Sequence, residues 1–196
     1  MARAGDCIES PILKERIVFR QTARDTGGAL LQFDDYQAVG APGPVEHLHL
    51  RQAERLAVVS GSMLVRVGGQ ERRLVAGEAV DIPPGVPHRW RNVGTDELHV
   101  LTDFRPALDL ERFFELIFGL ARDGKTDATG TPSFLQIAAM SPAYGIYLPA
   151  PPLPLQRALF ALLGPIARLR GYRPWYPAYS SIDPPMKRAG TESHQA

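Results

Sequence analysis

Glycine and proline divide the first half of this sequence into short apolar segments, and that spacing is the strongest constraint on its fold. The 196 residues include 18 glycines and 18 prolines, and both residue types end or reverse regular structure. The clearest case is Gly68-Gly69, which separates segments 62–67 and 70–75 and can take the positive φ angles of a two-residue hairpin turn. Frequent reversals between short segments predict a body made of β-strands.

The segments between these turn signals have the length and the alternation of strands. Breaks fall at 40–44 and at the proline-rich stretch 83–87, where missing N–H donors end ladder pairing. We expect strands at 16–22, 29–38, 45–50, 55–59, 62–67, 70–75, 79–82, 88–92 and 98–104.

The hydrophobic period changes after residue 105. An apolar stripe at helical spacing predicts a helix of about four turns; its members are Leu110, Phe113, Phe114, Ile117 and Leu120. Further helices are expected at 134–140 and 155–169, joined by an extended proline-rich connection at 149–154. The sequence therefore predicts an all-β barrel at 12–105, an α-helical C-terminal extension at 106–183 and a disordered tail at 184–196.

Charge and cysteine content exclude several classes of function. Lys and Arg number 22 against 21 Asp and Glu, so no strong field attracts nucleic acid, and we expect no such partner. The single cysteine, Cys7, cannot form an intramolecular bridge, and residues 1–10 lack the apolar block of a signal peptide. Both features favour a cytoplasmic location. The most apolar stretch, 158–167, is about half the roughly 20 residues that cross a bilayer, so no transmembrane segment is expected.

Three histidines and one glutamate have the spacing of a metal site. His47 and His49 point the same way if they lie in a strand, because alternate side chains share a face. Glu54 follows after enough chain to return a carboxylate to the same interior, and His88 begins a strand beyond the hairpin. This donor set suits Fe, Mn, Ni, Cu or Zn rather than an ion that prefers oxygen ligands alone. Taken alone, the His-x-His pair has another interpretation, as ordinary core or surface histidines.

The same residues carry a resemblance to a known family. The pattern His47-x-His49-(x)4-Glu54-(x)6-Gly61 resembles the first cupin motif, and Gly77-(x)5-Pro83-x-Gly85-(x)2-His88-(x)3-Asn92 resembles the second. One position departs from the first motif. That motif usually opens with a glycine, and Gly40 lies one residue earlier than the usual position. The resemblance covers about residues 29–104 and implies a jelly-roll β-barrel.

The resemblance also implies roles for particular residues. It makes four of them the ligands of one divalent transition metal ion: His47, His49, Glu54 and His88. It makes another four turn residues: Gly61, Gly77, Pro83 and Gly85. It further implies a homodimer, because cupins commonly pair their barrels.

Five other residues are candidates for the substrate pocket. Trp90 shares a strand face with the histidine two positions before it, so it either stacks on a planar substrate or fills the barrel. Phe33 and Tyr36 are candidates for the mouth, with burial in the core as the default for aromatic strand residues. Arg66 would suit a substrate carboxylate and His99 would suit acid-base chemistry, although their apolar strand neighbours favour an outward position for both.

These features predict a metal-dependent enzyme of the oxygenase type, a dioxygenase-like oxidoreductase acting on a small organic molecule. Two alternatives remain open: a metal-dependent isomerase or decarboxylase, and a non-catalytic cupin that binds or senses a small molecule. A separate choice concerns residues 155–179, where arginines and aromatic residues flank the last helix. Packing of that helix on its own protein is the favoured interpretation, and peripheral membrane contact is the alternative.

Overall fold

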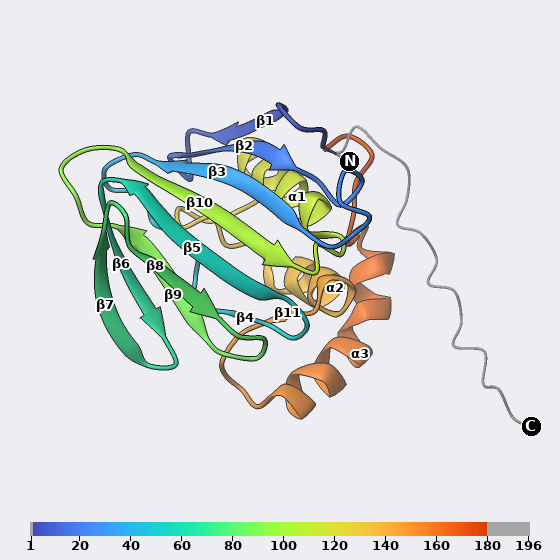
Figure 1. Cartoon of the computed structure of the whole chain (residues 1–196). Coiled ribbons are helices and arrows are strands. Elements are labelled where there is room, and N and C mark those ends of the chain that lie inside the picture. The colour runs from blue at the N-terminus through green and yellow to red at the C-terminus, as the bar shows by residue number, and fades with distance from the viewer. Residues whose placement is uncertain (1, 180–196) are drawn as a thin grey trace, which may run out of the picture.

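The computed structural model describes residues 2–179, and its strands form two main sheets and a separate two-stranded sheet, with helices along one side (Figure 1). The strands are β1 (Cys7–Ser10), β2 (Glu15–Gln21), β3 (Leu31–Gln37), β4 (Leu48–His49), β5 (Ala53–Ser60), β6 (Ser62–Val67), β7 (Gln70–Val75), β8 (Ala79–Ile82), β9 (His88–Asn92), β10 (Leu98–Arg105) and β11 (Ile146–Tyr147). The helices are α1 (Leu110–Arg122), α2 (Phe134–Tyr144) and α3 (Leu153–Leu169).

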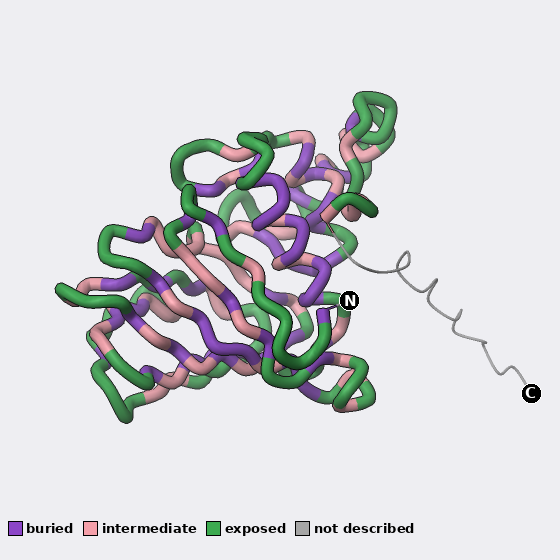
Figure 2. Tube along the Cα trace, turned by 90° about the horizontal axis from the view of Figure 1, so that it is seen from above, coloured by how far each residue is buried: buried purple, intermediate pink, exposed green. Residues whose placement is uncertain are grey.

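All strand pairs are antiparallel. The larger sheet has the order β1-β2-β3-β10-β5-β8, the smaller has the order β7-β6-β9, and β11 pairs with β4. Exposed residues gather in the loops and hairpin ends, whereas buried residues run through the strands and the helices that cover them (Figure 2). The predicted β-rich body followed by helices is therefore confirmed.

Several elements differ from the sequence prediction. Strand β1 lies before residue 12, where the barrel was expected to begin, and 45–50 contributes only the two-residue β4. Within the predicted extension, β11 returns to pair with β4, with Ile146 opposite His49. Such a short isolated pair has too little alternation to be seen in the sequence. The predicted disordered tail lies outside the described residues.

The two sheets bury one core between them. Its members come from β5, β8 and β10 of the larger sheet and from β6, β7 and β9 of the smaller one. The apolar residues on these strands alternate in sequence with exposed ones, which is the pattern of sheets with one buried face. The buried set is Leu56, Val58, Met63, Val65, Leu74, Ile82, Trp90, Leu98 and Val100.

The rest of the larger sheet is covered by helix α1 instead of by strands. Phe33 and Phe104 on the inner face of the sheet meet Phe114 of α1, whose ring centroid lies 4.9 Å from that of Phe33. Figure 1 shows α1 behind β2 and β3. The cavity described below lies between this half of the sheet and the helix.

Helix α3 packs on α2 and β11 through Phe160, near Ala138 and Tyr147. This agrees with the favoured interpretation of that helix. Its other side exposes four apolar side chains: Leu155, Leu162, Ile166 and Leu169. None of the helices among the described residues is long and apolar enough to span a membrane. The homodimer and the peripheral membrane contact stay predictions.

Candidate metal centre and its cavity

Three sheets and one isolated bridge bring the four predicted ligands together. His47 and His88 form an isolated antiparallel bridge, in which each backbone N–H donates to the other's carbonyl. His49 is fixed in β4, where its backbone carbonyl accepts a hydrogen bond from the N–H of Gly85. Glu54 lies in β5, opposite Phe104 of β10 and Ile82 of β8. The centre therefore forms where the larger sheet meets β4 and β9.

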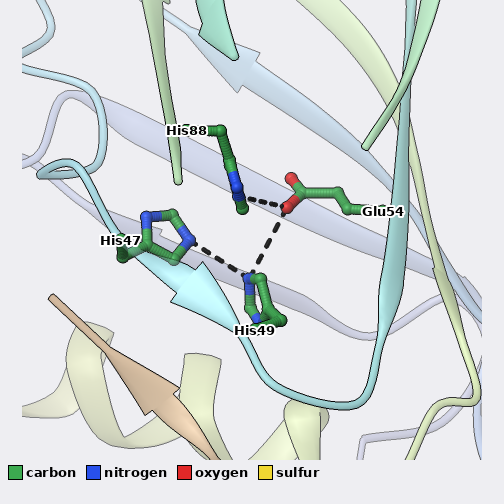
Figure 3. Close-up of side chains that lie close together, drawn as sticks. All are labelled: His47, His49, Glu54 and His88. Carbon is green, nitrogen blue, oxygen red and sulfur yellow. Dashed lines mark hydrogen bonds and ion pairs between the residues drawn. The ribbon is translucent and has the colours of Figure 1, made fainter. Parts of the chain in front are cut away.

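The four side chains point toward one another (Figure 3). The Nε2 atoms of His47 and His49 are 3.1 Å apart, and Nε2 of His49 lies 3.5 Å from Oε2 of Glu54. Nε2 of His88 lies 2.8 Å from the same carboxylate oxygen. One ligand atom from each residue fits within 4.8 Å of the others. Donors about 2.0–2.2 Å from one shared ion are about 3–4 Å apart, so the cluster has the size of a mononuclear metal site.

Backbone carbonyls orient two of the three imidazoles. Nδ1 of His47 lies 2.8 Å from the carbonyl oxygen of Val45, and Nδ1 of His88 lies 2.9 Å from that of Val86. A carbonyl oxygen only accepts, so Nδ1 must carry the proton and donate it. The Nε2 atom of each ring then faces the centre, which is the usual outer-shell arrangement of a metal-binding histidine.

Burial sets the protonation states of the four groups. It lowers the pKa of His47 to about 4, assisted by repulsion from His88, and lowers the pKa of His49 to about 3, assisted by repulsion from His47. Burial would raise the pKa of Glu54, but the neighbouring imidazoles, His88 foremost, outweigh it and the net shift is downward.

At neutral pH the centre therefore offers the neutral imidazoles of His47 and His49 and the ionised carboxylate of Glu54, the forms that bind a metal. His88 differs from the other two imidazoles. Burial lowers its pKa, but the charge of Glu54 outweighs burial and the net shift is upward. A metal ion competes with a proton at this position.

The centre opens onto a cavity of about 360 Å³. His47, His49 and Glu54 line one side of it, while α1, α2 and β11 close the other. Most of the lining is apolar, and eight aromatic side chains contribute: Phe33, Trp90, Phe104, Phe113, Phe114, Phe118, Tyr144 and Tyr147. The volume is that of a site for a small organic molecule.

Only two of the five predicted substrate-pocket residues line this cavity, Phe33 and Trp90. Tyr36 and His99 lie opposite each other in the β3–β10 ladder with stacked rings, on the outer face of the larger sheet. Tyr36 lies three residues after Phe33 in the same strand, so the two side chains are on opposite faces of the sheet. Nε2 of His99 lies 2.7 Å from Oδ1 of Asp34.

Arg66 also lies away from the cavity. Its strand buries Met63 and Val65, so Arg66 takes the opposite face. Its Nε lies 3.6 Å from Oε1 of Glu46.

Several polar residues of the cavity wall were not predicted from the sequence, among them Glu15, Asp35 and Thr102. The signal was present in the alternation of the strands. Asp35 has the same parity as Phe33, Glu15 has the same parity as Ile17, and these apolar neighbours are buried.

Comparison with known proteins identifies the domain that holds the centre. Residues 37–103 match the family model of the cupin domain. These residues form a cupin domain. The resemblance drawn from the two motifs is thereby confirmed, together with the jelly-roll fold that it implies. All four candidate ligands lie inside the match, whereas β1, β2 and the three helices lie outside it.

Solved cupin structures cover about half of the chain. KdgF from Halomonas sp. is 23% identical, covering 50% of this chain and 84% of its own, with a TM-score of 0.45. An RmlC-like cupin from Shewanella frigidimarina is 25% identical, covering 51% of this chain and 83% of its own, with a TM-score of 0.44. A search of curated protein sequences gave no match.

Proposed function

We propose that this cupin is a metal-dependent enzyme of the oxygenase type that acts on a small, largely apolar organic molecule. The observation that carries the proposal is the position of three candidate metal ligands, His47, His49 and Glu54, in the wall of a mostly apolar cavity. Three imidazoles and one carboxylate leave room on a six-coordinate ion for substrate or dioxygen. Bound Fe or Cu would supply redox chemistry, whereas Mn, Zn or Ni would supply Lewis-acid chemistry.

The protein's own residues bind and orient the substrate. The rings of Phe33, Phe104 and Phe114 lie within about one ring diameter of one another, giving flat apolar surfaces near His49. Such surfaces exclude water and pack best on aromatic or aliphatic groups. Neutral His47 and His49 and ionised Glu54 would hold the ion at neutral pH.

The charges of the wall favour this class over a decarboxylase or isomerase that acts on anionic molecules. Among the described residues that line the cavity, none is Lys or Arg. A substrate carboxylate distant from the metal would therefore be buried without a cationic partner, which is costly. A neutral or cationic apolar molecule meets no such cost.

Oxygen uptake by the reconstituted protein tests the proposal. Untagged protein purified without oxygen is analysed for metal, loaded separately with Fe²⁺, Mn²⁺, Cu²⁺, Ni²⁺ and Zn²⁺, and assayed with phenols, diketones, aromatic amines and sulfur amino acids. We expect uptake with at least one redox metal. Uptake should be lost in Glu54→Ala and kept in His99→Ala, a histidine outside the cavity.

Two results would overturn this proposal. Stoichiometric metal without turnover of any substrate would favour the binding or sensing alternative, in which α1 and α2, as parts of the cavity wall, report its occupancy. Equal uptake by Glu54→Ala and the wild type would remove the metal centre from the reaction.

A further inference from the structure

Two carboxyl groups share the cavity with the metal centre. Glu15 of β2 and Asp35 of β3 line its wall, and their side chains are joined by a hydrogen bond. Asp35 is only 3% exposed. A hydrogen bond between two carboxyl groups requires a proton on one of them. The pair therefore holds at least one proton between its members.

Two buried polar atoms on the same wall have no hydrogen-bond partner among the described residues. They are Oδ1 of Asp35 and Oγ1 of Thr102. Thr102 is 1% exposed and lies in β10, the strand between β3 and β5. Since buried polar atoms are normally satisfied, two such atoms facing one cavity indicate a ligand that hydrogen-bonds there.

Asp35 and Thr102 lie on the same inner face of the larger sheet as the candidate metal ligand Glu54. Asp35, Thr102 and Glu54 occupy three successive strands, β3, β10 and β5, with their side chains on the inner face. Thr102 pairs with Phe33, two residues from Asp35, and with Leu56, two residues from Glu54, so the acid pair and Glu54 lie at opposite ends of a diagonal across the inner face. The charge of Glu54 also contributes to the raised pKa of Asp35.

The charge of the pair selects the chemistry of its partner. Burial raises the pKa of Glu15 to about 7 and is the largest cause of the raised pKa of Asp35, so the pair is costly to ionise without a cation. No Lys or Arg among the described residues lines the cavity. A positive group must therefore come from the bound molecule, and aromatic rings around it add cation–π attraction.

We propose that Glu15 and Asp35 form a second polar subsite, which binds the ammonium group of an apolar primary amine whose hydrocarbon body packs against Phe33 and Phe114. The inference rests on the proposed function only in assigning the substrate to this cavity. Thr102 then donates its hydroxyl hydrogen to a polar atom nearer the metal end or accepts a hydrogen bond from the amine.

A series of molecules of equal shape tests the subsite. Phenethylamine, 2-phenylethanol and phenylacetate are titrated into the full-length protein by calorimetry, once loaded with Zn²⁺ and once after removal of metal. We expect the amine to bind at least tenfold more tightly than the alcohol or the carboxylate in metal-free protein. Because this arm needs neither metal nor turnover, failure of the oxygenase proposal would leave its result unchanged.

Matched variants distinguish a loss of amine binding at the subsite from a loss of folding or of metal binding. Asp35→Asn and Glu15→Gln should each lose the preference for the amine while keeping the affinity for the alcohol and the Zn²⁺ content. Asp34→Asn is the control, because Asp34 is adjacent in sequence but pairs with Arg20 and His99 outside the cavity. Melting temperatures identify a variant that has not folded, and the other variant then decides.

The proposal is overturned if phenylacetate or 2-phenylethanol binds as tightly as the amine. It is equally overturned if folded Asp35→Asn or Glu15→Gln keeps the amine preference of Asp34→Asn.

Discussion

Nε2 of His88 lies 2.8 Å from Oε2 of Glu54, although His88 belongs to the smaller sheet and Glu54 to the larger one. A metal ion held by both residues would tie the two sheets together beside the core that Leu56 and Met63 help to form. Metal binding should therefore affect the stability of the folded protein as well as the chemistry of the site.

Removal of metal should lower the melting temperature. A ligand at 1,000 times its dissociation constant stabilises the folded state by about 4 kcal/mol, because it binds little to the unfolded chain. Calorimetric melts of the Zn²⁺-loaded protein with and without a chelator measure this effect. Identical melts would show that no ion bridges the sheets.

His88→Ala should reduce metal affinity by more than the roughly 10- to 100-fold that is typical for loss of an outer-shell partner. The variant should still fold, because the core between the sheets is independent of the ion. Metal content after dialysis and circular dichroism are measured beside His99→Ala, which leaves the centre intact. Equal metal content in the two variants would exclude His88 from the ligands.

Glu15→Gln should remove a pH-dependent loss of stability. The folded protein raises the pKa of Glu15 from 4.5 to about 7 through burial. Between these values the folded state keeps a proton that the unfolded state has released, so the free energy of unfolding falls as pH rises, by up to about 1.4 kcal/mol per pH unit.

The variant carries no such proton. Its stability relative to wild type should therefore rise from pH 5 to pH 7 and then level off, as measured by urea unfolding at each pH. Asp35→Asn should change in the same direction, because burial and the charge of Glu15 also raise the pKa of Asp35. A constant difference across this range would mean that Glu15 is ionised throughout.

Gly43→Ala should destabilise the loop at the cavity. Gly43 has a φ of +67°, and a Cβ there would lie 2.1 Å from the carbonyl oxygen of Trp90. Gly27 has a φ of +61° but no heavy atom within 4 Å of the added Cβ, so Gly27→Ala isolates the backbone strain of about 1 kcal/mol. We expect Gly43→Ala to cost about 1–3 kcal/mol more in urea unfolding; equal costs would mean that the loop moves aside.

The strands and the ligand set were predictable because they rest on short-range signals. Gly68-Gly69 defines its hairpin through backbone freedom alone, and the parity of His47 and His49 puts both on one face. The family resemblance added the role of Glu54 and His88, whose convergence depends on how two sheets meet. The hydrophobic period of a single segment does not show how two sheets meet.

The cavity was less predictable, because its wall combines distant elements. Phe114 belongs to a helix whose apolar stripe was predicted. The sequence did not show which sheet that stripe packs against. Asp35 was overlooked although it shares the parity of Phe33, since a carboxyl group in a strand is usually exposed. Tyr36 and His99 could be assigned to the outer face only once the register of β3 and β10 was known.

Anomalous diffraction from a crystal of the metal-loaded protein tests the central claim most directly. Data collected on either side of the metal's absorption edge should give one strong peak about 2.0–2.2 Å from Nε2 of His47, His49 and His88 and from the carboxylate of Glu54. A metal peak at any other position, or a loaded crystal with no peak among these four side chains, would contradict the account.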